Sequence, residues 1–252
     1  AHAAGAFLAL YRASGGRRWK DRARAVVEAV VRTLVVQTDH GPALLAAPPG
    51  DAVLAAAQGG PAFASPLDGA EPSAIGTWAE VLLDWHVLAP AHGRTLPGGG
   101  ARAWAERLID HVHRLGRQAP LETATTLRLA ARSPRADELL VVSGGTATER
   151  RRALAWALVR GVVALQTPTG PDAAGPETSG NGDAVPAGEH PGDGMGRDDV
   201  TAGRHSRDGS LALYLCRGSM CHAPVGHTGD LDRLTGPAGG LGGRPDSGPN
   251  GP

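Results

Sequence analysis

Apolar side chains recur at helical spacing through the first half of the chain. Positions occupied every three or four residues predict helices over 3–14, 18–36, 73–89, 101–116 and 120–131. Gly15-Gly16 ends the first helix, so the first two helices are expected to form an antiparallel hairpin. The Ala, Gly and Pro-rich segments 37–72 and 90–100 are expected to be connections. The pattern therefore predicts a mainly helical unit over residues 1–135.

The pattern changes after residue 135. A continuous apolar run at 139–142, a helical pattern at 147–160 and a second apolar run at 162–165 predict a strand–helix–strand unit with parallel strands. Another apolar run at 211–216 predicts a further strand. We expect a small α/β appendage made of residues 136–166 and 211–235.

The glycines at 144 and 145 follow the first strand of this unit. Glycines at the start of a helix can cradle a phosphate, but they also occur where a strand simply turns into a helix. The short Ser143-Gly-Gly-Thr146 run carries no lysine or further glycine, so we favour the turn.

Two segments are too poor in apolar residues to form a packed core. Residues 167–210 are rich in Gly and Pro and contain no aromatic residue, Leu or Ile. Residues 236–252 are similarly rich in Gly and Pro. Such segments bury too little apolar surface to offset their conformational entropy. We expect a disordered insert at 167–210 and a disordered tail at 236–252.

Composition narrows the class of protein. The chain has 252 residues, a formal net charge of +0 and two cysteines. The balanced charge does not indicate a nucleic-acid partner, and two cysteines are too few for a secreted disulfide scaffold. No apolar run reaches the roughly 20 residues that cross a bilayer, and no signal peptide is evident, so we expect a cytoplasmic chain without a membrane partner. Because the sequence begins without Met inside a helical pattern, we also expect a fragment or a truncated open reading frame.

A pair of acidic residues precedes the helix predicted at 73–89. Asp68 and Glu71 lie three residues apart on a Gly/Pro-containing turn, and Ser73 can cap the helix that follows. Paired carboxylates on a stiff turn can serve acid/base chemistry on a polar substrate. The same residues are also common as solvated turn residues that favour the helix dipole. Spacing leaves both interpretations open.

The two cysteines lie close together near the C-terminal end. Four residues separate Cys216 from Cys221, whereas thioredoxin-type redox motifs have two. His222 and His227 follow, but the spacing differs from common zinc sites, so we predict no metal and expect two ordinary thiols at the end of a strand.

Several of these pieces occur together in an order known from one family. The chain resembles the YyaL-type thioredoxin domain-containing proteins, related to spermatogenesis-associated protein 20. The resemblance is carried by the segment at 10–19, the Asp-Gly-Ala-Glu-Pro-Ser segment at 68–73, the strand–helix–strand unit and the Cys-x4-Cys-x-x-Pro segment at 213–224. The resemblance covers about residues 1–235 without the insert. It implies the C-terminal portion of a longer protein that starts with a thioredoxin-like domain. The helices would then be a partial α/α toroid, similar to six-hairpin glycosidases and to N-acylglucosamine 2-epimerases.

The resemblance implies a carbohydrate-related role. Asp68 and Glu71 would be the catalytic or sugar-binding carboxylates, with Ser73 and Trp78 as substrate-binding residues. We expect no cofactor, a small carbohydrate as ligand, and the missing thioredoxin-like part as a partner. Because most of the toroid is absent, this chain by itself is expected to be inactive. The alternative is a non-catalytic redox-linked or scaffolding module that uses Cys216 and Cys221.

Overall fold

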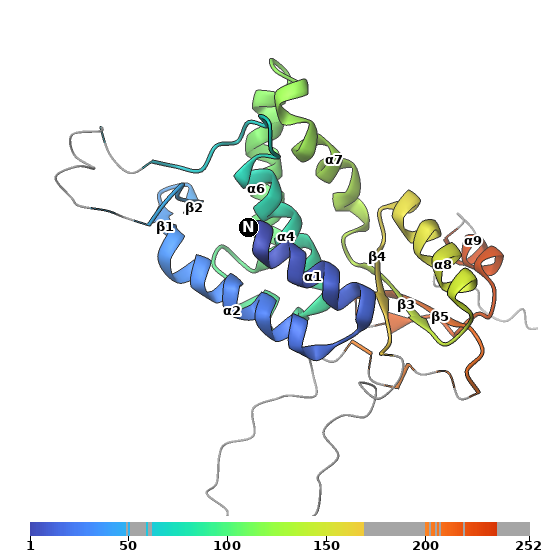
Figure 1. The fold of residues 1–252 in the computed structure, drawn as a ribbon. Coiled ribbons are helices and arrows are strands. Elements are labelled where there is room, and N and C mark those ends of the chain that lie inside the picture. The colour runs from blue at the N-terminus through green and yellow to red at the C-terminus, as the bar shows by residue number, and fades with distance from the viewer. Residues whose placement is uncertain are drawn as a thin grey trace, which may run out of the picture.

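The chain folds into a helical part and a smaller α/β part that lie side by side (Figure 1). The computed structural model describes residues 1–48, 50, 59, 62–168, 200–201, 203–204, 206, 208–218 and 220–235. Its mainly helical character confirms the prediction from apolar spacing. The predicted tail at 236–252, and residues 169–199 of the predicted insert, lie outside the described residues.

Five α-helices build most of the helical part, close to the predicted ranges. They are α1 (His2–Ser14), α2 (Arg17–Leu34), α4 (Ala74–Leu88), α6 (Ala101–Gly116) and α7 (Ala124–Arg132), the last preceded by a 3-10 turn at Leu121–Thr123. The hairpin of α1 and α2 is antiparallel, as predicted (Figure 1). Gly15 ends α1 with a φ of 67°, a conformation that glycine adopts without a steric penalty.

Two of the predicted connections contain regular structure. Strands β1 (Val35–Thr38) and β2 (Gly41–Leu44) form an antiparallel hairpin directly after α2. The helix predicted at 18–36 therefore ends two residues early, because the β-branched pair Val35-Val36 starts a strand. The loop predicted at 90–100 contains the short helix α5 (Pro90–Thr95), whose first residue is a proline with its φ already fixed near the helical value.

The α/β part contains the predicted strand–helix–strand unit. Strands β3 (Glu138–Ser143) and β4 (Val163–Gln166) pair in parallel and are joined by α8 (Ala147–Arg160), which confirms that prediction. Strand β5 (Ala212–Arg217) pairs with β3 in antiparallel fashion, and β6 (Met220–Cys221) pairs with β5. The strand order is β4-β3-β5-β6, and α9 (Thr228–Thr235) follows.

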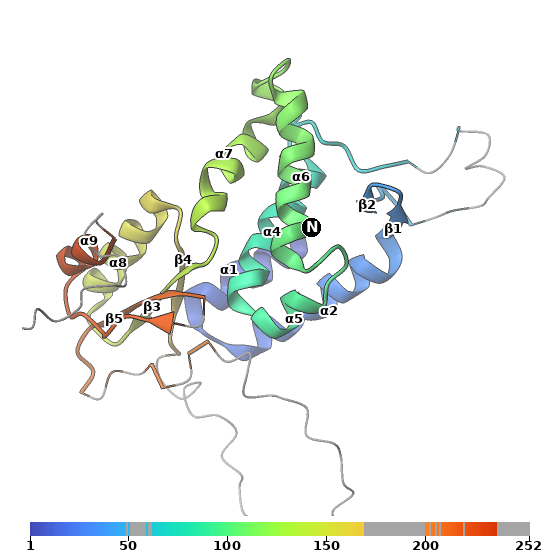
Figure 2. The ribbon, with the colours of Figure 1, turned by 180° about the vertical axis from the view of Figure 1, so that it is seen from behind.

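Alternate side chains of the sheet face two different apolar layers. Leu139 and Val141 pack into the core of the helical part, whereas Leu140 and Val142 pack with α8 and α9. All six residues of β3 are buried, as expected for a central strand with both faces covered. The sheet is therefore a middle layer that shares its core with the helices, which Figure 2 shows from behind.

Large aromatic side chains fill the helical core. Trp78 and Trp85 of α4 and Trp104 of α6 are fully buried, and Trp78 meets Trp104 edge to face with ring centroids 5.7 Å apart.

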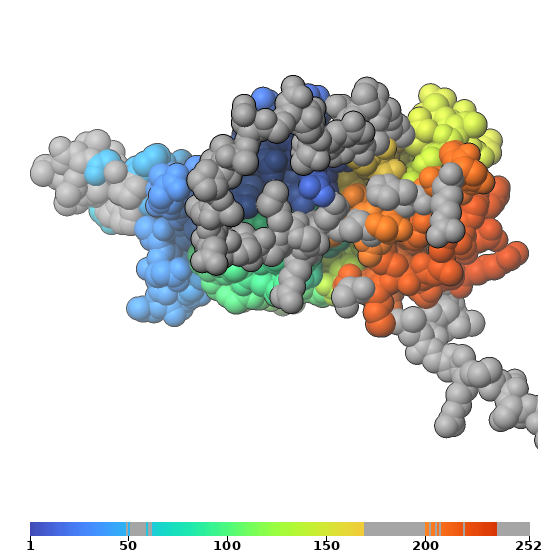
Figure 3. All heavy atoms as spheres, turned by 90° about the horizontal axis from the view of Figure 1, so that it is seen from below, coloured from blue at the N-terminus to red at the C-terminus, as the bar shows by residue number. Residues whose placement is uncertain are grey.

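Figure 3 shows the molecule from below, with the light-blue β1–β2 region at one end and the orange and red C-terminal part at the other. Within the described helices, none combines the length and the apolar character that crossing a bilayer requires.

The glycine turn before α8 has the simpler of its two predicted roles. Thr146 caps α8 in a reciprocal capping box with Glu149, whose carboxylate accepts a hydrogen bond from the Thr146 backbone N–H at 2.7 Å. A Cβ added at Gly144 would lie 2.1 Å from the Ser210 carbonyl oxygen. The start of α8 is therefore occupied by the chain's own groups, which supports the turn over the phosphate cradle.

Candidate ligand groove and disulfide

Asp68 lies between the N-terminal ends of two helices. Its Oδ1 accepts a hydrogen bond from the Ser73 backbone N–H at 2.7 Å, and its Oδ2 accepts one from the Thr125 backbone N–H at 2.8 Å. Partial burial raises the pKa of Asp68, but these backbone hydrogen bonds outweigh burial and hold the pKa below its ordinary value. The carboxylate is thus ionised and engaged on both oxygens, which gives Asp68 a structural role.

The other predicted site residues do not gather around Asp68 into a binding surface. Ser73 is buried, and its Oγ accepts the Gly76 backbone N–H at 3.0 Å, so it caps α4 as predicted. Trp78, predicted as a substrate-binding residue, is instead fully buried against Trp104, which leaves no ring face for a sugar. Glu71 is exposed on the turn. The catalytic assignment of Asp68 and Glu71 stays a prediction.

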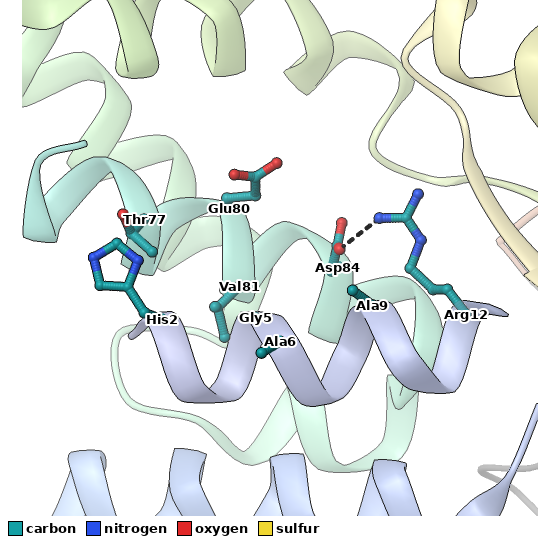
Figure 4. A pocket seen from close by; sticks show the side chains of 9 residues that line it. All are labelled: His2, Gly5, Ala6, Ala9, Arg12, Thr77, Glu80, Val81 and Asp84. Atoms are coloured by element: carbon teal, nitrogen blue, oxygen red, sulfur yellow. Dashed lines mark hydrogen bonds and ion pairs between the residues drawn. The ribbon is translucent and has the colours of Figure 1, made fainter. Parts of the chain in front are cut away.

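A groove opens between α1 and α4, away from those residues. Its volume is about 360 Å³, and Figure 4 shows its lining. The α1 wall combines small residues with two basic side chains, whereas the α4 wall carries two carboxylates; the lining residues are His2, Gly5, Ala6, Ala9, Arg12, Thr77, Glu80, Val81 and Asp84. The small residues keep the α1 wall low, so the polar groups beside it can reach a ligand.

An ion-pair network fixes the carboxylates of this groove. Asp84 Oδ2 accepts from Arg12 Nη1 at 3.1 Å, and Arg132 of α7 donates to Asp84 Oδ1. Arg132 also lies 3.6 Å from Glu80 Oε1, and Arg128 donates to Glu80 Oε2 at 2.9 Å. Arg12 donates further to the Ala164 carbonyl of β4 at 3.2 Å. The network therefore ties α1, α4, α7 and the sheet together.

Burial and charge oppose each other at Asp84. Its side chain is only 8% exposed, and burial raises the pKa of Asp84, but the neighbouring guanidinium groups of Arg132 and Arg12 outweigh burial and hold the pKa below its ordinary value. For Arg132, burial lowers the pKa, and Asp84 and Glu80 raise it overall. Asp84 is thus a carboxylate at neutral pH. It can accept hydrogen bonds from a ligand but has no proton to donate as a general acid.

Sequence reasoning missed this groove, although one signal for it was present. Glu80 and Asp84 are the two acidic residues of the otherwise apolar α4, four positions apart and so on one face. A carboxylate on the most apolar helix of a chain is a candidate for a buried ion pair or a site. Spacing could not predict the partners Arg12 and Arg132, because they lie 72 and 48 positions from Asp84 in the sequence.

The two cysteines form a disulfide between neighbouring strands. Cys216 of β5 and Cys221 of β6 stand opposite each other in the strand register and are bonded through their sulfurs. The pairing replaces the expectation of two ordinary thiols and occupies both sulfurs that a zinc site would use. Arg204 donates to the Cys221 Sγ at 3.0 Å. No group of three potential metal ligands occurs among the residues that the structure describes.

Comparison with models of protein families, with curated proteins and with solved structures finds no match for this chain. The resemblance to the YyaL-type proteins therefore stays a prediction, and the function has to be argued from the groove and the disulfide.

Proposed function

We propose that this chain binds a small polar ligand, of the carbohydrate class, in the groove between α1 and α4. The observation that carries the proposal is the placement of Glu80, Asp84 and Arg12 around one groove of about 360 Å³, a volume typical of small-molecule sites. Carboxylate and guanidinium groups together can accept from and donate to the hydroxyls of a sugar. The helical part would be a portion of an α/α toroid, an architecture suggested by its antiparallel hairpin and by the sequence resemblance.

The groove supports binding better than turnover. Acid/base catalysis on a glycosidic or ring-opening step needs one group that can give up a proton near neutral pH. The low pKa of Asp84 removes it from that role, and both Asp84 and Glu80 are already engaged by arginines. We therefore expect purified chain to show background rates with epimerase and glycosidase substrates.

Titration of the chain with a panel of neutral, amino and acidic sugars, followed by NMR or calorimetry, tests the proposal. Loss of a hydrogen bond to a charged group costs about 1.5–3 kcal/mol, so Glu80→Gln is expected to weaken binding by roughly tenfold or more. Glu28→Gln is the matched control, because Glu28 pairs only with Arg24 on the exposed face of α2 in the described contacts. Absence of any shift with every sugar, or equal losses in both variants, contradicts the proposal.

The larger architecture has its own test. A partial toroid would belong to a longer protein whose preceding domain is thioredoxin-like, and that domain would be the partner of this chain. The coding sequence upstream of Ala1 decides this point. An in-frame thioredoxin-like domain supports it, and an in-frame stop codon directly upstream contradicts it.

The disulfide favours a second candidate function, a redox-linked module. Thiols in the cytoplasm are kept reduced, so a disulfide there is usually a transient, catalytic or sensing one. With the cytoplasmic location that the sequence predicts, the Cys216–Cys221 pair would cycle between disulfide and dithiol. Thiol titration of the folded chain before and after treatment with a dithiol tests this function. A count of zero thiols rising to two supports it, and a count that never changes contradicts it.

A further inference from the structure

The two sulfurs of the disulfide have different surroundings. Cys216 is 3% exposed and belongs to the core that the sheet shares with the helices. Its Sγ lies 3.9 Å from the backbone carbonyl oxygen of Tyr214. Cys221 is partly exposed on the short edge strand β6. Cys221 is therefore the more accessible of the two residues to an incoming molecule.

Arg204 is held against the exposed sulfur. Its Nη2 donates to the Cys221 Sγ at 3.0 Å, and its Nη1 donates to the Val200 carbonyl at 2.5 Å. The Arg204 backbone N–H also donates to the Thr201 carbonyl at 3.0 Å, and Thr201 is itself buried. The guanidinium is thus positioned by a turn of the chain, in addition to its contact with the sulfur.

After reduction, these surroundings favour the thiolate at Cys221 and the neutral thiol at Cys216. A guanidinium beside a sulfur stabilises the thiolate, the form that attacks and leaves in thiol–disulfide exchange. A buried sulfur beside a carbonyl oxygen favours the thiol, because the thiol hydrogen can donate to the oxygen and the negative charge of a thiolate is repelled. Arg217, which follows Cys216 on β5, is already joined to Glu138 of β3 at 2.6 Å.

We propose that Cys221 is the sulfur through which this disulfide exchanges with a dithiol, and that Arg204 stabilises the Cys221 thiolate. The proposal rests on the second candidate function and names its reacting atom. Cys216 is then the buried resolving sulfur, which re-forms the disulfide when the Cys221 sulfur is attacked or oxidised.

The exchange balances in two steps. A thiolate of the dithiol attacks the Cys221 Sγ because Cys221 is the accessible cysteine, a new S–S bond forms, the bond to Cys216 breaks, and Cys216 leaves as a thiolate that takes a proton from solvent. The buried Cys216 is the poorer leaving group, so accessibility directs this first step, and Arg204 assists the second step, in which Cys221 leaves. The second thiol of the dithiol loses its proton to solvent and attacks its own sulfur in the mixed disulfide, releasing Cys221 as a thiolate that faces Arg204. The dithiol is oxidised by two electrons, and the protein disulfide is reduced by two.

Mapping of the mixed disulfide tests which sulfur reacts. The folded full chain is treated with excess glutathione, quenched in acid and digested with trypsin, which cleaves after Arg217 and so separates Cys216 from Cys221. Glutathione is expected on the peptide of Cys221. In parallel, the single-cysteine variants Cys216→Ser and Cys221→Ser are reacted with an aromatic disulfide reagent. The thiol of Cys221 is expected to react fast and that of Cys216 slowly.

Variants of Arg204 test the role of the guanidinium. In the Cys216→Ser background, Arg204→Gln is expected to slow the reaction of Cys221 about threefold, the size of effect expected for a partly exposed charge pair. Arg204→Lys is expected to restore most of the rate, since a cation remains. Arg233→Gln is the matched control, because its side chain is 83% exposed and pairs with Asp230 on α9. Circular dichroism confirms that each variant is folded.

The outcomes separate this proposal from the function on which it rests. A disulfide that resists dithiothreitol in the folded chain contradicts the redox-linked function itself. Ready reduction with glutathione found on Cys216, or with no effect of Arg204→Gln, leaves that function standing and overturns the proposal. Labelling at Cys221 with a rate that depends on Arg204 supports it. Where a single-cysteine variant fails to fold, the wild-type map still identifies the reacting sulfur, and mapping of the Arg204→Gln chain with both cysteines present tests the guanidinium.

Discussion

The carboxylate of Asp68 accepts a hydrogen bond from the backbone N–H of Thr125, 57 positions further along the chain, at 2.8 Å. Its second oxygen accepts the N–H of Ser73, the capping residue of α4. One side chain thus satisfies backbone donors at the starts of α4 and α7, where helices have unpaired N–H groups and the positive end of their dipole. The turn that resembles a catalytic acid pair therefore joins two helices.

We predict that Asp68→Ala destabilises the fold by about 1–3 kcal/mol, because it removes two hydrogen bonds to a charged group at helix ends. Chemical denaturation followed by circular dichroism measures the change. Glu71→Ala is the matched control on the same turn, and its exposed position predicts a change within about 0.5 kcal/mol. A larger loss in Glu71→Ala than in Asp68→Ala would show that the structural reading of this turn is wrong.

We predict that Asp84→Ala is more damaging, at about 3–5 kcal/mol. The substitution removes the closest counter-charge of Arg132, whose side chain is only 11% exposed, and an unpaired buried charge is costly. Thermal and urea unfolding measure the loss. The double variant Asp84→Ala with Arg132→Met is expected to recover part of it, because no buried charge then remains. A single variant as stable as the wild type would rule out a structural role for this network.

Stability is predicted to fall in acid because of these carboxylates. Three carboxylates have folded-state pKa values below their ordinary value, although burial alone would raise them: Asp68, Asp84 and Asp137. Backbone hydrogen bonds lower the pKa of Asp68, and neighbouring arginines lower the pKa values of Asp84 and Asp137. A lowered folded pKa adds stability that is present above the unfolded pKa, about 3.9, and is lost as the pH falls through the folded pKa. The free energy of unfolding should therefore decline below about pH 4.

The Asp68→Asn variant checks this prediction, since an amide does not titrate. Urea unfolding at a series of pH values from about 6 to 2 gives the slope of stability against pH. The variant is expected to start from lower stability at pH 6 and to decline less steeply in acid. If the free energies of unfolding of the variant and the wild type fall in parallel with pH, the folded-state pKa of Asp68 is not lowered.

Local patterns were enough to predict most of the regular elements. Helices such as α6, with Trp104 and Val112 inside, repeat apolar residues at clear helical spacing, and Gly15 and Ser73 mark helix ends by their backbone and side-chain chemistry. The parallel pairing of β3 with β4 followed from the connecting helix. Strands β1 and β2 and the helix α5 were missed, because four to six residues are too few to show a period.

The groove was beyond local patterns for a different reason. Its geometry depends on contacts of Asp84 with Arg12 of α1, which precedes it in the sequence, and with Arg132 of α7, which follows it. Trp78 lies on the buried face of α4, and spacing could not show that Trp104 covers its ring. The alternative of a redox-linked module used the two cysteines as a pair, but their separation of five positions does not show that β5 and β6 set them opposite each other.

Two glycines of the α1 region are predicted to respond in opposite directions to substitution by alanine. Gly5 lies inside α1, where an added Cβ would be 3.8 Å from Val81 Cγ2, an ordinary contact, so Gly5→Ala is expected to stabilise the fold by about 0.5–1 kcal/mol. Gly15 has a φ of +67°, and its added Cβ would lie 2.5 Å from the Gln166 carbonyl oxygen.

Gly15→Ala therefore combines backbone strain with a clash against the strand that follows α8, and a loss of more than about 1 kcal/mol is expected. Urea unfolding of the two variants beside the wild type measures both changes. The Gly5→Ala methyl also projects into the α1–α4 groove, so the same variant should lower affinity for any sugar that binds there while raising stability. A variant that gains stability and keeps full affinity would place the ligand elsewhere, and one that loses stability would contradict the packing of α1 on α4.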